Sequence, residues 1–393
     1  MRCRRAGVTL VLMAASLGAA GLVGEGVVAP ARAPALGWAG SASTQQAIGP
    51  GTVLEHIRQV GPGGRIEAYV LRVDLSDPGV RAGLLYPGVI AGVRTVSAMA
   101  SAAGAFAAVN GDFFNIGESG APVGPVVDGG RPLKAPQPGR GLAAGVGTDG
   151  IGQISTVALR GFVTLPSGRR ALSDLNDANP GYPPMLAPDG IGLFTPVWGS
   201  YPRAGAVRGL RPVAEALIRG GRVARVSHHA GTGTIPTGSY VLLGAGAGAR
   251  ALARLRIGQA VSVTYGQRTT APTPFQFAIG GKHWLVRGGA LQGGLPASGG
   301  ASRTAVGFAD GGRTMYLVAT EGSRAGVPGL DLPDLASFVR GLGVSDAVDL
   351  DDGGSTTIVA RLPRHAGLTL LNRPDDGAER RVANGIGLFA VGS

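Results

Sequence analysis

The sequence predicts an α+β (α/β-like) fold with a large mixed, mainly antiparallel β-sheet, few helices and a strand-rich insert in the middle. Short runs of alternating apolar residues dominate the chain and are separated by Gly, Pro and Asp, as strands and turns are. Clear helical spacing of apolar residues occurs once, in residues 331–343. A chain of 393 residues, 44% of them hydrophobic, can bury one large core or two smaller ones.

The N-terminal segment has the pattern of a secretory signal peptide. Residues 1–35 combine basic residues, an apolar stretch from Val8 to Ala20 and small residues before position 36. The apolar stretch is short for a membrane span of about 20 residues. We expect a linker over residues 36–51, one domain over residues 52–393, and a secreted or cell-envelope protein that contacts the membrane only before cleavage. The only cysteine, Cys3, lies in the signal peptide.

The formal net charge of +12 does not by itself indicate nucleic-acid binding. Lys134 and Lys282 are the only lysines, and the arginines are scattered along the chain. No stretch interleaves basic and aromatic residues, as a binding site for single-stranded nucleic acid does. We therefore expect no nucleic-acid partner, while the positive charge leaves a polyanionic or phosphate-bearing partner possible.

The strands follow in order along the chain. Ile66–Leu75 reads as a strand, and Ala105–Asn115 reads as a strand that enters an Asn-Gly turn. Residues 143–155 and 304–320 each predict a hairpin around Asp-Gly. The first hairpin also spells G-x-G-x-x-G, but no helix follows it, so a dinucleotide site is excluded. Residues 189–266 form the predicted insert, in which the GAGAGA run is expected to be a loop.

A strand–helix–strand unit is predicted near the C-terminus. Residues 331–343 read as a helix with Pro333 in the first turn and glycines at the end. An apolar strand precedes this helix, and the strand Asp346–Leu350 follows it. Loops at the carboxyl ends of such strands usually carry the chemistry, and these ends hold Glu321 and Asp351.

The segment Ala347–Arg361 places three carboxylates around the end of a buried strand. On a strand, Asp349 and Asp351 project to one face and Asp352 to the other. Carboxylates at such a position serve as nucleophile, general base or metal ligand, or they belong to an ordinary polar turn. Adjacent acidic charges destabilise the fold unless an arginine or a cation compensates them.

Other polar residues complete the candidate set. A calcium loop of the EF-hand type is excluded because Gly353 and Ala360 stand where oxygen ligands are needed. No zinc spacing, G-x-S-x-G elbow or phosphate-binding loop is present. Arg303 and Arg380 each stand at the start of an apolar strand and could form bidentate pairs with phosphate. Asp112 precedes two phenylalanines, an arrangement that can face a sugar.

Five segments, in order, resemble the phosphodiester glycosidase family, the family of the lysosomal uncovering enzyme. They are AVNGDFF, RTAVGF, LVATEG, VDLDDGGSTT and ERRVANG. The likeness spans residues 65–391, and the middle segment is similar to bacterial exported members associated with exopolysaccharide metabolism and the cell wall. The resemblance implies hydrolysis of a sugar-1-phosphodiester to free sugar and a phosphomonoester. It therefore also implies a glycan or sugar-phosphate partner and a catalytic role for the domain of residues 52–393. The family's polar positions fall on Asn110, Asp112, Arg303, Glu321, Asp351, Ser355 and Arg380.

The resemblance and two-carboxylate chemistry together predict roles for these residues. The candidate catalytic carboxylates are Asp351, Glu321, Asp112 and Asp349, of which Asp351 or Glu321 is the expected base or nucleophile. The candidate ligand-binding residues are Arg303 and Arg380 for phosphate, Asn110 and Asp112 for sugar hydroxyls, and Ser355, Gly353 and Gly354 at the turn. The chain departs from the family at Asp352 for Gly, Glu321 for Asp and Arg381 for Pro.

Two alternatives stay open at this point. In a metal-dependent phosphodiesterase, Asp112, Asp349 and Asp351 bind a divalent cation and water attacks phosphorus. In a non-catalytic polysaccharide-binding wall protein, the departures at Asp352 and Glu321 abolish turnover. No cofactor is required by the glycosidase hypothesis, and a Ca²⁺ or Mg²⁺ ion remains open.

Overall fold

The computed structural model describes residues 39–61, 64–179, 185–297, 299–322 and 325–392. These residues fall within one compact unit, residues 34–393. The expected signal peptide, with Cys3, lies outside the described residues. No helix in the described ranges is long and apolar enough to cross a membrane.

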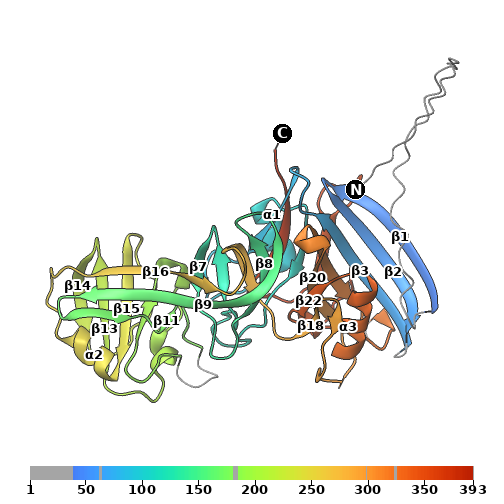
Figure 1. Ribbon diagram of the computed structural model, residues 1–393. Helices are drawn as coiled ribbons and strands as arrows, with labels where there is room; N and C mark the ends of the chain where they lie inside the picture. Colours follow the sequence, from blue (N-terminus) through green and yellow to red (C-terminus); the bar gives the residue numbers. More distant parts are fainter. Residues whose placement is uncertain (1–38, 62–63, 180–184, 298, 323–324, 393) are drawn as a thin grey trace, which may run out of the picture. The chain divides into compact units, whose positions relative to one another are not determined.

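The predicted fold class is confirmed: the strands are mainly antiparallel and the described residues contain three α-helices. The strands are divided among four sheets rather than gathered in one. The first sheet has the strand order β1-β2-β3-β21-β20-β22-β18-β19, and Figure 1 shows its blue and orange-to-red parts. Its strands are β1 (Ala39–Gly49), β2 (Thr52–Gly61), β3 (Gly64–Asp74), β18 (Trp284–Arg287), β19 (Ala290–Leu291), β20 (Arg303–Ala309), β21 (Thr314–Thr320) and β22 (Asp346–Asp349).

Two differences from expectation concern this sheet and the insert. Residues 39–49, expected within the linker, form the edge strand β1. This strand pairs antiparallel with β2 from Ala39 to Gly49. The GAGAGA run is not a loop: it ends a strand and begins helix α2 (Gly246–Ala253). Gly248 allows the helix to pack closely against Gly190. A Cβ at this position would lie only 2.2 Å from the carbonyl oxygen of Gly190.

The predicted strand–helix–strand unit is confirmed as β21, α3 (Leu332–Gly341) and β22. Asp331 caps α3 by accepting a hydrogen bond from the amide of Asp334, and Pro333 occupies the first turn. β21 and β22 both pair antiparallel with β20, which lies between them, so their carboxyl ends share one edge. α3 buries Leu335, Phe338 and Val339 against this sheet.

A second sheet of five strands supplies the rest of that edge. Its order is β24-β23-β5-β25-β4, with β5 in the centre. Helix α1 (Val96–Ala103) packs beside it. The strands are β4 (Val80–Leu85), β5 (Ala107–Asn110), β23 (Ile358–Arg361), β24 (Leu368–Leu370) and β25 (Gly385–Ala390). Side chains of the first and second sheets share one apolar core.

The remaining strands form two sheets that include the predicted insert. The seven-stranded sheet has the order β10-β9-β8-β17-β6-β7, with β16 beside β9, and contains the predicted hairpin β8–β9. The insert forms the sheet β11-β12-β15-β13-β14. The strands are β6 (Val126–Asp128), β7 (Arg131–Lys134), β8 (Leu142–Gly147), β9 (Gly152–Leu165), β10 (Gly168–Ala171), β11 (Asp174–Leu175), β12 (Ile191–Phe194), β13 (Val213–Arg219), β14 (Arg222–Ser227), β15 (Ser239–Ala245), β16 (Ser262–Thr269) and β17 (Phe275–Gly280).

Candidate active site

The segment after β22 joins the first and second sheets. The amide of Leu350 donates to the carbonyl of Thr304 at 2.9 Å, and the amide of Asp351 donates to the carbonyl of Gly111 at 2.9 Å. These bonds hold the segment against β20 on one side and against the turn after β5 on the other. They bring Asp351 next to the turn that carries Asp112, although the two residues are far apart in the sequence.

Asp112 and Asp351 form a pair of buried carboxyls. Their residues are 3% and 7% exposed, respectively. Burial raises the pKa of Asp112 to about 7, opposed by a hydrogen bond from the Gly124 amide and the charge of Lys134, while Asp351 raises it further. Burial also raises the pKa of Asp351 to about 6, opposed by a hydrogen bond with the Ser355 side chain. Two neighbouring carboxyls whose pKa values are raised by burial are suited to acid–base chemistry.

One oxygen of Asp351 has unused hydrogen-bonding capacity. Its Oδ2 is buried and has no hydrogen-bond partner among the described residues. The same holds for the side-chain nitrogen of Asn384, whose Oδ1 accepts a hydrogen bond from the Asp112 amide at 2.8 Å. Unpartnered buried polar atoms at a carboxylate pair indicate a place where a polar ligand would bind.

Asn110 is fully buried and uses its carboxamide within the protein. Its Nδ2 donates to the carbonyl of Asp351 at 2.7 Å, and its Oδ1 accepts from the Thr304 hydroxyl and the Thr357 amide. The side chain therefore ties β5 to the segment that carries Asp351. Its predicted binding of sugar hydroxyls stays a prediction.

Ser355 and Arg380 lie beside Asp351. Nη1 of Arg380 donates to the Ser355 hydroxyl at 3.2 Å, and the positive charge of Arg380 lowers the pKa of Asp351. Arg380 also forms two hydrogen bonds with Asp376, of 2.7 and 3.0 Å. A Cβ at Gly354 would lie 2.2 Å from Nη2 of Arg380, so only glycine allows this approach. The Gly353 amide donates to Ser302, and its φ of 58° favours glycine.

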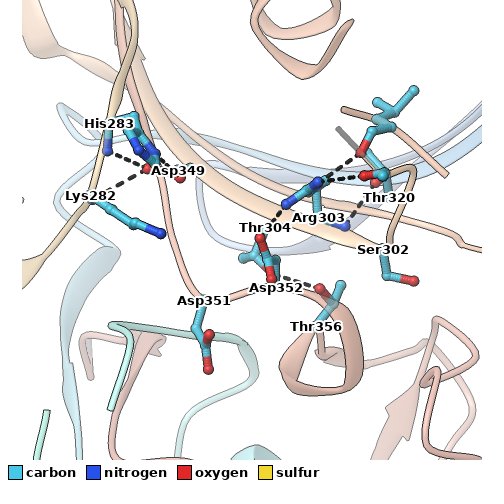
Figure 2. Close-up of polar contacts among 12 residues, drawn as sticks. Lys282, His283, Ser302, Arg303, Thr304, Thr320, Asp349, Asp351, Asp352 and Thr356 are labelled. Atoms are coloured by element: carbon cyan, nitrogen blue, oxygen red, sulfur yellow. Dashed lines mark hydrogen bonds and ion pairs between the residues drawn. The ribbon is translucent and has the colours of Figure 1, made fainter. Parts of the chain in front are cut away.

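Arg303 supplies the compensation that the paired acidic residues need. Its Nη1 forms an ion pair with Asp352, while Nε donates to Leu330 and Nη2 to Gly299 (Figure 2). The guanidinium is thus held by one carboxylate and two carbonyl groups. The expected compensation by an arginine is thus confirmed for Asp352, whereas phosphate binding by Arg303 stays a prediction.

The expectation that Asp349 and Asp351 share one face is wrong. β22 ends at Asp349, and the chain turns before Asp351, so the two carboxylates lie apart in Figure 2. Asp349 accepts hydrogen bonds from the amides of His283, at 2.5 Å, and Lys282, at 3.3 Å. Its Oδ2 lies 2.8 Å from Nδ1 of His283. Asp349 therefore fixes the turn before β18, and its predicted catalytic role stays untested.

Glu321 directly follows β21, and its carboxylate has Arg373, Glu67 and Asp375 as neighbours rather than Asp112 and Asp351. Burial raises its pKa to about 7, and the amide of Arg373 lowers it by donating to both carboxylate oxygens, at 3.1 and 3.2 Å. The negative charges of Glu67 and Asp375 raise it further. Glu321 is thus a third carboxyl with a raised pKa, among neighbours other than Asp112 and Asp351.

Sequence reasoning did not single out Lys134 or Asn384. Lys134 is fully buried and pairs with Asp177 at 2.6 Å, and its charge acts on Asp112. The scarcity of lysine was a usable indication of an unusual site. Asn384 stands in an Asn-Gly dipeptide that is equally typical of a turn, so its contact with Asp112 could not be predicted.

An open groove of about 540 Å³ adjoins Arg380. Its walls come from loops before α1, after β5 and after β12. The lining includes Phe114, Tyr201 and Arg381, side chains suited to a sugar or an anionic ligand. The groove therefore offers room for a ligand beside Arg380.

The three carboxylates of the metal alternative are not gathered, since Asp349 faces His283. Within the described ranges, no group of three or more His, Cys, Asp or Glu residues is placed to hold a metal ion. The dependence of any activity on a divalent cation stays a prediction to be tested.

The fold and site define a mainly antiparallel β-protein with a buried carboxylate pair suited to acid–base hydrolysis. Residues 213–389, slightly less than half of the chain, match the family model of phosphodiester glycosidases. The resemblance to that family is thus confirmed for this part, which contains Asp351, Ser355 and Arg380. No curated protein matches the chain.

Solved structures with TM-scores of 0.71 share the fold, and another is similar at a lower score. A hypothetical protein from Synechocystis has 24% identity and a TM-score of 0.71, over 87% of this chain and 62% of that one. A protein from Burkholderia pseudomallei K96243, described as exported, has 20% identity and a TM-score of 0.71, over 91% and 97% of the two chains. The catalytic domain of zebrafish N-acetylglucosamine-1-phosphodiester α-N-acetylglucosaminidase has 14% identity and a TM-score of 0.48, over 89% and 88%.

Proposed function

We propose that this protein is an exported phosphodiester glycosidase that cleaves sugar-1-phosphodiester bonds in cell-surface or extracellular glycans. The substrate class is of the N-acetylglucosamine-phosphate type, and free sugar is the product. The buried carboxyl pair beside Ser355 and Arg380 carries this proposal, because three of these four residues lie in the part that matches the family. The proposed export agrees with the N-terminal sequence pattern.

Asp351 is the proposed base or nucleophile. Its lower pKa, about 6, leaves it ionised at neutral pH more often than Asp112. Its unpartnered Oδ2 can reach a ligand without breaking a hydrogen bond within the protein. Glu321, the other candidate, is held by the Arg373 amide.

Asp112 is the proposed hydrogen-bond and proton donor. With a pKa of about 7, it is largely protonated at weakly acidic pH and can donate to a sugar hydroxyl or to the leaving oxygen. A phosphate leaving group is a weak base, so little proton transfer is needed if cations stabilise its charge. Arg380, which reaches Ser355 beside Asp351, is one such cation.

The bond that breaks distinguishes the proposed glycosidase from a phosphodiesterase. The mature protein is incubated with an N-acetylglucosamine-1-phosphodiester in ¹⁸O water, and the products are analysed by ³¹P NMR and mass spectrometry. Label in the free sugar with an unlabelled phosphomonoester means attack at the anomeric carbon and supports the proposal. Label in the phosphate means attack at phosphorus and contradicts it.

A control with chelator addresses the alternative mechanism, and a binding assay addresses the non-catalytic one. Loss of turnover with EDTA, restored by Ca²⁺ or Mg²⁺, would favour the metal-dependent phosphodiesterase if the label is in phosphate. Saturable binding of the glycan with no turnover of any phosphodiester would favour the wall-binding protein.

A further inference from the structure

The two arginines predicted to bind phosphate are already paired with carboxylates. Arg303 pairs with Asp352, and Arg380 forms a bidentate pair with Asp376. Each pair carries no net charge, so its attraction for a phosphate anion is weaker than that of a free guanidinium. A site for a sugar-phosphate would benefit from a further cation near the carboxylate pair.

Lys282 is such a cation. It is exposed, and its ammonium lies 4.9 Å from the centre of the Phe113 ring, next to Asp112 in the chain. Within the described ranges, no carboxylate forms an ion pair with this ammonium. In Figure 2, its side chain extends away from the Asp349 carboxylate. Its charge is therefore available to a ligand.

The turn that carries Lys282 is held against both Asp112 and Asp349. A Cβ at Gly280 would lie 2.4 Å from the nearer oxygen of Asp112, and a Cβ at Gly281 would lie 3.3 Å from the carbonyl oxygen of Asp349. Asp349 also binds the amides of Lys282 and His283 through one carboxylate oxygen. The backbone of Lys282 is thus fixed relative to the carboxylate pair, which limits the entropy lost when its side chain binds a ligand.

We propose that Lys282 binds the phosphate group of the substrate and that Asp349 is a positioning residue that fixes its turn. This inference rests on the proposed function and adds a phosphate-binding residue to it. Lysine ammonium groups bind phosphate as compact point charges. The positioning role fits the location of Asp349, whose carboxylate contacts the turn of Lys282 and His283 and lies apart from Asp351.

The test measures phosphate affinity and turnover separately. Inorganic phosphate binding is measured by calorimetry on wild type and on Lys282→Met, Lys282→Arg and Asp349→Asn. The matched control is Arg287→Met, which removes another exposed cation, 5.1 Å from the Trp284 ring in the same hairpin. Melting temperatures verify that each variant is folded.

We expect Lys282→Met to weaken phosphate binding about 10- to 100-fold, the range for a hydrogen bond to a charged group. Lys282→Arg is expected to recover most of it, and Arg287→Met to bind like wild type. Asp349→Asn should weaken binding in a folded protein that retains the ammonium. With a phosphodiester substrate, Lys282→Met should raise KM more than it lowers kcat.

Two results would overturn the inference: no phosphate binding by wild type, or equal affinities of wild type and Lys282→Met. Lys282-dependent phosphate binding without hydrolysis of any phosphodiester would support the inference and contradict the proposed function. The two failures are therefore distinguishable.

Discussion

At the scale of single residues, the main feature is that ordinary aspartates titrate near neutral pH. Asp112 and Asp351 have raised pKa values because burial penalises their charged forms, and among the described residues neither forms an ion pair with a cation. The positive charges of Lys134 and Arg380 act on them from nearby and limit the shift. Raised values of this kind let both carboxyls exchange protons in the physiological pH range.

The first prediction concerns Asp351. Replacing it by Asn removes the ionisable oxygen while keeping the shape, so we expect kcat to fall about 10²- to 10⁴-fold, the contribution typical of acid–base groups. The control Asp346→Asn, at the other end of β22, should retain wild-type kcat. Steady-state release of sugar measures both. An Asp351→Asn enzyme within threefold of wild type would remove Asp351 from the mechanism.

The second prediction is a bell-shaped dependence of kcat/KM on pH. Activity should rise as pH increases through about 6, because Asp351 must be ionised, and fall through about 7, because Asp112 must be protonated. In Asp112→Asn the fall above pH 7 should disappear, since the substituted amide cannot ionise. A fall that persists unchanged in this variant would mean that another group causes it.

At the scale of elements, short turns between strands decide where the side chains lie. The turn after β17 runs against the Asp112 carboxyl, and the segment after β22 runs against β20 and β5. Glycine is required where these backbones approach a side chain closely. The carboxylate pair is therefore a product of how turns from different sheets pack together.

The third prediction tests this packing. In Gly280→Ala, the new Cβ would come within 2.4 to 2.7 Å of both oxygens of Asp112, so the carboxyl must move. We expect kcat/KM to fall about 100-fold, the effect of a displacement of about 1 Å at a reacting group. Gly266→Ala, in β16, is the control because a Cβ there meets nothing within 4 Å. Equal kinetics of the two variants would contradict the prediction.

At the scale of the whole molecule, folding buries the Asp112 carboxyl and thereby disfavours its charged form. The folded-state pKa of Asp112, about 7, lies above the ordinary value of 3.8. For a carboxyl with a raised pKa, the associated stability is fully present below about pH 3.8 and is lost as pH rises toward 7. Function at neutral pH therefore costs this protein some stability.

The fourth prediction follows from that sign. Between pH 5 and 7, the free energy of unfolding of wild type should fall by about 2 to 3 kcal/mol more than that of Asp112→Asn, because one pKa unit corresponds to about 1.4 kcal/mol. Urea unfolding at the two pH values measures the difference, and titration of other groups cancels between the proteins. Equal changes in the free energy of unfolding of the two proteins would show that folding does not raise the pKa of Asp112.

Sequence by itself determined the elements whose signals are local. The hairpins at Asp-Gly, helix α3 with its Asp331 cap, and the strand–helix–strand unit depend on neighbouring residues, which the chain order displays directly. The candidate carboxylates at strand ends were also visible, because polar residues interrupted apolar runs. The helix in the GAGAGA run was missed because glycine is a poor helix former and its tight packing is not a local property.

Only the tertiary structure decided which polar residues work together. Asp112 and Asp351 meet through bonds between segments more than 200 residues apart, while Asp349, two residues from Asp351, faces elsewhere. Pairing of Arg303 and Arg380 with carboxylates, and the unpaired state of Lys282 among the described residues, equally depend on distant neighbours. The physical reason is that burial and charge depend on proximity in space, whereas the sequence orders residues only along the chain.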